Sequence, residues 1–274
     1  MSGATPAYLD ESPEPAAQPS HEGPANPLSL TGRTAVVTGA SRGIGHALAA
    51  GLISAGANVV ALQRGTISSE LLSLAEQKGV FVEAQTVNLA DEESISEAVE
   101  AVLEKHQIDI LVNNAGTQIR HDSTEFPLND FDAVMDINLR AVFQLCQGFG
   151  RSMVERGNGK IINLASMLSY QGGFRIPAYA ASKGAVVQLT KALCNEWAPR
   201  GVNVNAVAPG YFATDMNSAL LADAERHQQI SERIPAGRWG RPEDMAGAVV
   251  FLASTAADYI HGTVIPVDGG WLSR

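Results

Sequence analysis

Residues 34–45 read TAVVTGASRGIG, an apolar strand-like run that leads through a glycine-rich turn into a helical segment. A turn of this kind needs residues that tolerate unusual backbone angles, and a phosphate that approaches the backbone needs positions without side chains. The N–H groups at a helix N-terminus attract such an anion. We therefore predict a dinucleotide-binding loop, with a plain tight turn as the alternative. Its predicted binding residues are Gly39, Ser41, Arg42, Gly43, Ile44 and Gly45.

Strands and helices alternate from this loop to the C-terminus. Segments of helical period separate short apolar runs, which lie at 34–38, 58–63, 80–87, 109–114, 160–166, 202–209 and 262–270. Continuous apolar strands between helices are typical of a parallel sheet covered on both faces, and right-handed crossovers make such a sheet doubly wound. The pattern predicts an α/β fold, a doubly wound Rossmann-type sheet of about seven strands with six or so helices, in a single domain over residues 28–274.

Composition excludes several classes of protein. Of the 274 residues, 45% are hydrophobic and 18% are charged, and the net charge of −10 argues against a nucleic-acid surface. Cys146 and Cys194 show no metal-ligand spacing, so we expect no metal site and a reducing, cytoplasmic location. No apolar run approaches the roughly 20 residues that span a membrane, and the N-terminus lacks the order of a secretory signal.

Residues 1–27 are rich in proline, alanine, serine and glutamate and show no apolar period. This composition predicts a disordered N-terminal tail. The alternative is an arm that docks on a neighbouring subunit.

The end of the second apolar run bears on the choice of cofactor. In dinucleotide-binding folds an acidic residue about 20 positions past the glycines binds the ribose 2′-hydroxyl of NAD. Here the run ends in Gln63, and Arg64 follows. Arg64 and Arg42 can face a 2′-phosphate from two sides, although both could also be solvated loop residues. We therefore favour NADP(H) over NAD(H).

Three groups of residues can supply the chemistry of hydride transfer. Ser166 follows a strand at the carboxyl edge where open α/β sheets bind ligands. Tyr179 and Lys183 are four residues apart in a helical segment and share one face. The ammonium, together with the positive nicotinamide ring, is expected to favour the phenolate and lower the pKa of the phenol. Asn138, within the long helical segment before Ser166, could anchor a water that carries the proton outward.

These motifs occur together in an order that resembles the short-chain dehydrogenase/reductase family. They are TGASRGIG at 38–45, NNAG at 113–116, Asn138, Ser166, Tyr179 with Lys183, and PG at 209–210. The resemblance covers roughly residues 30–274 and implies a homotetramer and a catalytic tetrad of Asn138, Ser166, Tyr179 and Lys183. It also implies that Lys183 holds the nicotinamide ribose. The further cofactor residues that it implies are Asn88, Leu89, Asn114, Ala115, Gly116, Tyr179, Pro209, Gly210, Phe212 and Thr214. Asn88 stands where many members carry an aspartate.

Within this family, the segments at 161–183, 195–216, 233–245 and 267–274 resemble the 2-dehydro-3-deoxy-D-gluconate 5-dehydrogenase branch. The resemblance implies oxidation of a secondary alcohol on a small sugar acid, although that branch often uses NAD(H). One alternative is an NADPH-dependent ketoreductase of a specialised metabolite. A non-redox relative, namely a dehydratase, an epimerase or a cofactor-binding regulator, is the other.

A polar rim is expected around the substrate, which we predict to be a small molecule with a carboxylate. Arginine matches a carboxylate in bidentate geometry, and two arginines follow the NNAG and Ser166 motifs. The rim residues we predict are Gln118, Arg120, His121, Met167, Gln171, Arg175 and Tyr211. The segment from Tyr211 to about Arg233 would form a mobile lid. Alternatively, Arg120 and Arg175 face water or another subunit.

Overall fold

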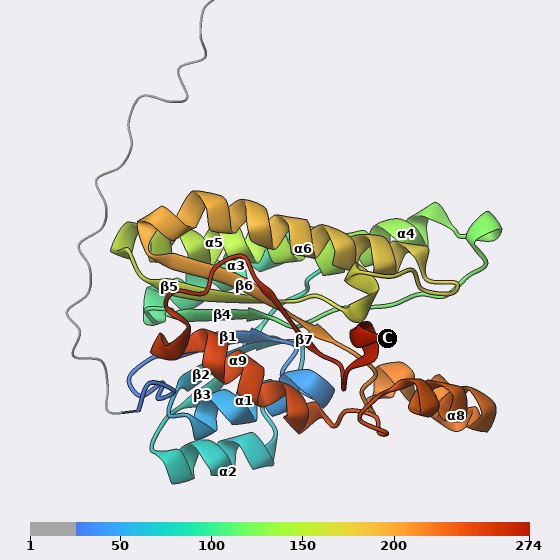
Figure 1. The fold of residues 1–274 in the computed structure, drawn as a ribbon. Coiled ribbons are helices and arrows are strands. Elements are labelled where there is room, and N and C mark those ends of the chain that lie inside the picture. The colour runs from blue at the N-terminus through green and yellow to red at the C-terminus, as the bar shows by residue number, and fades with distance from the viewer. Residues whose placement is uncertain (1–25) are drawn as a thin grey trace, which may run out of the picture.

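Seven parallel strands form one sheet in the computed structural model, which describes residues 26–274. Their order across the sheet is β3-β2-β1-β4-β5-β6-β7 (Figure 1). The strands are β1 (Thr34–Thr38), β2 (Asn58–Gln63), β3 (Val82–Thr86), β4 (Ile110–Asn113), β5 (Gly159–Leu164), β6 (Val202–Pro209) and β7 (Val264–Val267). The predicted doubly wound Rossmann-type sheet is confirmed.

Helices cover both faces of the sheet, with α1, α2 and α9 on one side and α3, α5 and α6 on the other (Figure 1). The helices are α1 (Gly43–Ser54), α2 (Ser69–Lys78), α3 (Glu92–Lys105), α4 (Leu128–Met135), α5 (Ala141–Arg156), α6 (Pro177–Trp197), α7 (Ser218–Ala222), α8 (Ala224–Arg233) and α9 (Ala246–Ala253). Residues 26–274 thus hold more helices than the sequence suggested. One reason is that a short π-helical turn divides the long segment before β5 into α4 and α5.

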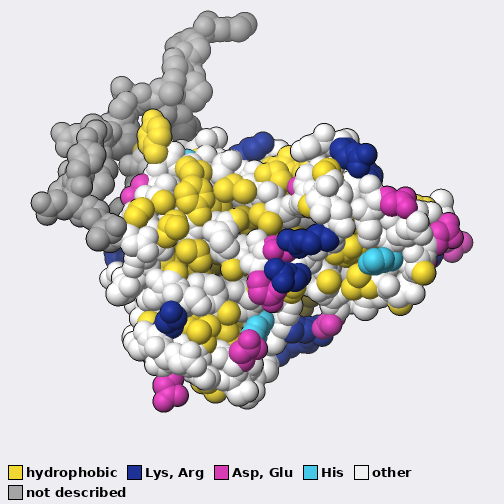
Figure 2. Space-filling model, turned by 60° about the horizontal axis from the view of Figure 1, so that its bottom comes forward, with side chains coloured by type: hydrophobic (Ala, Val, Ile, Leu, Met, Phe, Trp, Pro, Cys, Tyr) yellow, Lys and Arg dark blue, Asp and Glu magenta, His cyan; other side chains and the backbone are white. Residues whose placement is uncertain are grey.

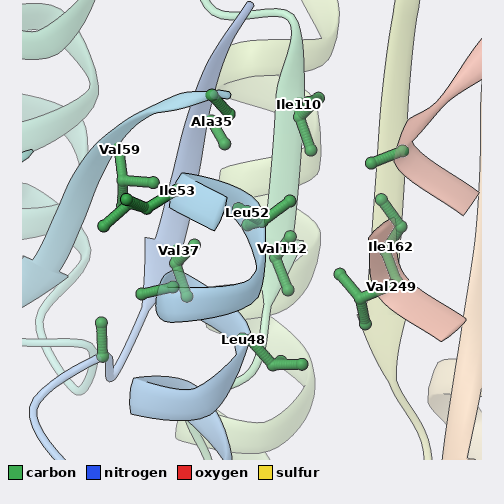
Figure 3. Packing of buried hydrophobic residues seen from close by; sticks show 14 of the residues in the cluster. Ala35, Val37, Leu48, Leu52, Ile53, Val59, Ile110, Val112, Ile162 and Val249 are labelled. Carbon is green, nitrogen blue, oxygen red and sulfur yellow. The ribbon is translucent and has the colours of Figure 1, made fainter. Parts of the chain in front are cut away.

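Two apolar cores result from the alternation of side chains along the strands. Ala35 and Val37 of β1 point into the core with α1, α2 and α9, whereas Val36 points into the core with α3, α5 and α6. In the first core, Leu48 and Leu52 of α1 pack against the strands and are fully buried (Figure 3). Because both faces of the sheet are buried, its strands are almost continuously apolar.

The chain reverses direction across the sheet between β1 and β4. From β1 it runs to β2 and β3 on one side, and β4 then starts the series on the other side. Loops that leave the carboxyl ends of two such strands diverge and open a crevice for ligands. The glycine-rich turn follows β1 and the NNAG motif spans the end of β4, so both lie at this crevice.

Residues at the start of the described chain are bonded to the rest of the domain. The carbonyl of Pro27 accepts hydrogen bonds from Thr255 Oγ1 at 3.1 Å and from the N–H of Ala256 at 3.3 Å. Leu30 is fully buried. The rest of the predicted tail, residues 1–25, lies outside the described part of the chain.

Candidate active site

The turn after β1 requires glycine at three positions. Gly39 and Gly43 adopt φ angles of 70° and 55°, which lie in the left-handed region that L-residues disfavour. A Cβ at Gly45 would collide with the carbonyl oxygen of Gly39. Glycine is therefore required for conformation at the first two positions and for space at the third.

The N-terminus of α1 presents free backbone N–H groups beside this turn. Arg42 occupies the capping position, but its side chain makes no capping hydrogen bond, and the first turn of α1 contains no acidic residue. Ser41 is exposed and Ile44 is half-buried in the same turn. Uncapped N–H groups and the partial positive charge of the helix suit a phosphate.

Hydrogen bonds fasten the loop after β4 to the glycine-rich turn. Thr38 Oγ1 accepts from the N–H groups of Asn114 at 3.0 Å and Ala115 at 2.9 Å. Asn114 Nδ2 donates to the carbonyl of Thr38 at 2.9 Å. Ala115 Cβ lies 3.2 Å from the position that a Cβ would take at Gly39. Asn114, Ala115 and Gly116 therefore line the crevice beside the turn.

An amide occupies the carboxyl end of β2, where a carboxylate would bind the ribose of NAD. Gln63 is buried, and its Nε2 donates to the carbonyls of Thr66 at 2.8 Å and Gly65 at 3.2 Å. Its Oε1 has no hydrogen-bond partner within residues 26–274. A buried acceptor without a donor costs free energy, so a ligand hydroxyl could bind here. Arg64 is exposed at the same edge.

The segment after β6 closes the other side of the crevice. Arg42 Nη1 lies 3.2 Å from Asp215 Oδ2, in an ion pair whose side chains are 77% and 73% exposed. Thr214 Cγ2 lies 3.7 Å from the position that a Cβ would take at Gly43. These contacts join the glycine-rich turn to the start of the predicted lid.

Close packing fixes the first residues of that segment. Gly210 follows Pro209 at the end of β6, and a Cβ at Gly210 would lie 2.7 Å from Cα of Asp268. Phe212 is buried and pairs with Gly240 in a parallel bridge. Pro209, Gly210, Phe212 and Thr214 thus lie on one well-packed segment.

The loop after β3 carries Asn88 and Leu89. Asn88 is exposed, and its Oδ1 accepts from the N–H of Ala90 at 3.2 Å. Leu89 packs against the core under α3 and α5. None of these contacts joins the two residues to the glycine-rich turn. Their role in binding the cofactor therefore stays a prediction.

Ser166, Tyr179 and Lys183 come together at the carboxyl end of β5. Ser166 is buried and lies close enough to Tyr179 to lower the pKa of its phenol. Lys183 Nζ lies 5.8 Å from the centre of the Tyr179 ring and donates to the carbonyl of Leu164 at 2.6 Å. The helix α6 supplies the tyrosine and the lysine one turn apart, as the sequence predicts.

Ser169, which the sequence analysis missed, joins the strand end to α6. Its Oγ accepts from the N–H of Ser166 at 3.2 Å and donates to the carbonyl of Lys183 at 2.7 Å. Ser166 Oγ in turn accepts from the N–H of Leu168 at 3.1 Å. The capping pattern S-x-x-S at 166–169 was the available signal.

Burial dominates the protonation behaviour of the site without its cofactor. It raises the pKa of Tyr179, and Ser166 offsets this only in part. Burial also lowers the pKa of Lys183 to about 8. In both groups burial disfavours the charged form, so the effect of Lys183 and a bound nicotinamide on Tyr179 stays a prediction.

Asn138 lies within the π-helical turn Asp136–Arg140 and is fully buried. Its Oδ1 accepts from the N–H of Thr117 at 2.8 Å, and its Nδ2 donates to the carbonyl of Thr117 at 2.9 Å and to Ser182 Oγ at 3.1 Å. Asn138 therefore joins the loop after β4 to α6. These bonds use both donors of its amide group.

Arg175 is part of the predicted rim, but its side chain is paired within the protein. Its Nε lies 3.0 Å from Asp122 Oδ1, and its carbonyl accepts from the N–H of His121 at 3.2 Å. His121 Nε2 lies 2.6 Å from Asp130 Oδ2. Arg175 has a φ of 63°, which is unfavourable for a non-glycine residue. The loops after β4 and β5 are thus held together at the mouth of the site.

Of the other predicted rim residues, some make polar contacts or are half-buried, and others belong to an apolar cluster. In the amide orientation that satisfies both groups, Gln118 accepts from the Arg120 guanidinium at 2.9 and 3.1 Å. Gln171 is half-buried. Met167 is buried in a separate apolar cluster with Trp239 and Trp271, against which Tyr211 packs. The tyrosine ring lies 4.8 Å from that of Trp271 and 5.2 Å from that of Trp239.

Comparisons with known proteins identify the family of this chain. A family model described as enoyl-(acyl carrier protein) reductase matches residues 39–272. The 2-dehydro-3-deoxy-D-gluconate 5-dehydrogenase of Bacillus subtilis (strain 168) is 47% identical over 247 residues, covering 90% of this chain and 97% of the relative.

Two solved structures share the whole architecture. One, from Beutenbergia cavernae, is described as a proposed NAD(P)-dependent gluconate 5-dehydrogenase with NADP bound at low occupancy. It is 50% identical, covers 91% of this chain and 100% of that one, and has a TM-score of 0.88. The other, a gluconate 5-dehydrogenase from Burkholderia cenocepacia J2315 in complex with NADP and tartrate, is 41% identical. It covers 90% and 98% of the two chains, with a TM-score of 0.84.

The predicted family is therefore confirmed by sequence, by fold and by the shared extent of the chains. This chain belongs to the short-chain dehydrogenase/reductase family of NAD(P)-dependent oxidoreductases.

Proposed function

We propose that this enzyme transfers a hydride between NADP(H) and a secondary alcohol or ketone on a small sugar acid, such as 2-dehydro-3-deoxy-gluconate. The observation that carries the proposal is that the buried Ser166 and Lys183 both lie beside Tyr179, with Lys183 Nζ 5.8 Å from the centre of its ring. The B. subtilis relative is named for this sugar acid, and the two solved structures for gluconate. Their names support the substrate class.

The crevice fits a nicotinamide dinucleotide. Its glycine-rich turn excludes side chains, and the uncapped N-terminus of α1 offers donors to phosphates. We propose that Asn114, Ala115 and Gly116 line the cofactor and that Lys183 holds the nicotinamide ribose. When bound, the nicotinamide supplies the group that accepts or donates the hydride.

The cofactor preference that we propose is for NADP(H). No carboxylate stands at Gln63 to repel a 2′-phosphate, and Arg64 is exposed beside it. Arg42 is close enough to the turn to contribute, although it pairs with Asp215 in this structure. The two relatives solved with NADP support this preference.

We propose that Tyr179 exchanges the proton of the substrate oxygen. Its raised pKa keeps the phenol protonated near neutral pH, which suits donation to a ketone. In alcohol oxidation the phenolate accepts the proton, and a nearby positive charge at Lys183 favours it. Ser166 would hold the substrate oxygen against the phenol. Asn138 would act as a positioning residue, because its hydrogen bonds hold the loop at Thr117 against α6.

The compartment in which the enzyme acts and its oligomeric state are the next points of the proposal. We propose that it acts in the cytoplasm, since both cysteines are free and buried. Within residues 26–274, no helix has the length and apolar character that crossing a bilayer requires. We also propose a homotetramer, as in the resembling family. Hydrophobic side chains gather on the left half of the face in Figure 2. Among the described residues, Phe143 and Tyr259 are 44% and 99% exposed.

The test is a spectrophotometric survey of nicotinamide absorbance. D-Gluconate, 2-dehydro-3-deoxy-gluconate and uncharged sugars are assayed with NADP(H) and with NAD(H). The proposal predicts that a sugar acid with NADP(H) gives the highest kcat/KM, and that Arg64→Ala lowers the preference for NADP(H). It fails if no sugar acid exceeds its uncharged analogue.

A further inference from the structure

We propose that Arg233 of α8, held against Trp271, binds the carboxylate of the substrate. This inference rests on the proposed function and assigns the carboxylate to the lid rather than to Arg175. Arg233 Cζ lies 3.9 Å from the centre of the Trp271 ring. Stacking on an aromatic face orients a guanidinium and leaves its edge free for hydrogen bonds.

A continuous set of contacts joins this arginine to the catalytic residues. The Trp271 ring lies 4.8 Å from that of Tyr211, and Tyr211 packs against the cluster that contains Met167. Met167 follows Ser166 directly in the chain. A substrate whose reacting oxygen lies at Ser166 therefore has the Tyr211–Trp271–Arg233 group on one side.

The charges around Tyr211 suit an anion. Arg226, Arg233 and Arg120 each act to lower the pKa of Tyr211 against the opposing effect of burial, so three cations face one phenol. They come from both ends of α8 and from the loop after β4. In the part of the chain that the structure describes, none of these three arginines forms an ion pair. A group of cations without partner acids attracts a small anion.

Two nearby groups strengthen the assignment. Trp271 is 4% exposed, and its Nε1 has no hydrogen-bond partner among residues 26–274. A carboxylate oxygen would give this buried donor an acceptor. Asp268, three residues before Trp271, accepts hydrogen bonds from the N–H groups of Gly270 at 2.8 Å and Leu272 at 2.9 Å.

Arg175 provides the contrast. It also follows a catalytic strand, but its Nε is paired with Asp122 at 3.0 Å, so a substrate would have to displace a carboxylate of the protein. Arg233 requires no such exchange, and its aromatic support is already in place. The geometry favours Arg233 as the residue that distinguishes acids from neutral sugars.

The test compares Arg233→Met with Arg175→Met, on D-gluconate and on D-gluconamide, which has an amide in place of the carboxylate. For Arg233→Met we expect kcat/KM on gluconate to fall at least tenfold, mainly through KM, with gluconamide changed less than twofold. Arg175→Met should affect both substrates equally. Thermal melting of each variant shows whether it folds, and Arg226→Met provides a second variant of the same cluster.

A direct binding measurement separates this proposal from the proposed function. Gluconate and gluconamide are titrated into the NADP-loaded protein while tryptophan fluorescence is followed. If the parent binds gluconate more tightly and Arg233→Met abolishes the difference, the carboxylate site stands even where turnover is absent. The proposal would be overturned if Arg233→Met weakened the binding of gluconate and gluconamide equally, or if the parent bound gluconate no more tightly than gluconamide.

Discussion

Replacement of the buried Lys183 by methionine is expected to stabilise the cofactor-free protein. Lys183 is 4% exposed, and its Nζ donates to the carbonyl of Leu164 at 2.6 Å. No carboxylate pairs with it within residues 26–274. Methionine has a similar length and no charge, so Lys183→Met removes a buried ammonium without leaving a partner charge behind.

The magnitude follows from the pKa of Lys183, which burial lowers from 10.5 to about 8. One unit corresponds to about 1.4 kcal/mol, so below pH 8 the buried charge costs the folded state roughly 3 kcal/mol. Loss of the bond to Leu164 offsets about 1 kcal/mol. The variant should therefore gain about 2 kcal/mol near pH 7.

This gain should depend on pH with a definite sign. Between pH 8 and 10.5 the folded parent has released the proton that its unfolded chain still holds. The parent therefore becomes more stable as pH rises through this range, and the advantage of the variant disappears. Urea unfolding near pH 7 and near pH 10, at one protein concentration, measures the difference.

Lys160→Met is the matched control. Lys160 is also buried, but its Nζ bonds Asp258 Oδ1 at 2.6 Å and Asn203 Oδ1 at 3.0 Å. Its removal leaves two acceptors without their donor, so this variant should lose about 1–3 kcal/mol. If Lys183→Met were less stable than the parent near pH 7, burial would not disfavour the ammonium and the reasoning would be refuted.

Three further predictions concern the cofactor site and the N-terminal segment. Gly45→Ala should weaken NADP(H) binding at least tenfold in a fluorescence titration, because the added Cβ meets the carbonyl of Gly39. Unchanged binding would contradict the close packing of the turn. Asp215→Asn frees Arg42 from an exposed ion pair and should tighten NADP(H) binding by up to about fivefold, without affecting the binding of NAD(H). An equal change for both cofactors would show that Arg42 does not bind the 2′-phosphate. Deletion of residues 1–25 should leave activity and melting unchanged, because Pro27 is itself anchored at Thr255, and a fall of several degrees would show that the deleted segment stabilises the enzyme.

The sequence was sufficient for the parts of the structure that depend on local pattern. Apolar runs such as TAVVT at 34–38 identify strands because both faces of the sheet are buried. Gly39 and Gly43 could be recognised because the turn requires left-handed backbone angles. The spacing of Tyr179 and Lys183 placed them one helical turn apart on α6.

Other features depend on contacts between distant segments, and the sequence did not reveal them. The pairing of Arg175 with Asp122 joins loops after different strands. The stacking of Arg233 on Trp271 joins α8 to the C-terminal residues. The pKa of Tyr179 could not be inferred from the nearby ammonium alone, because the extent of burial decides its direction. Asn138 was expected on a regular helix, whereas a π turn brings its amide to Thr117 and Ser182.

The central claim is that Tyr179 transfers the proton in a nicotinamide-dependent reaction, and Tyr179→Phe tests it most directly. The ring keeps its place on α6, but the phenolic hydroxyl is gone. We predict that kcat falls by about 10²–10⁴, while the Kd for NADP(H), measured by fluorescence titration, stays within twofold of the parent. A variant that retains turnover within threefold of the parent would contradict the account.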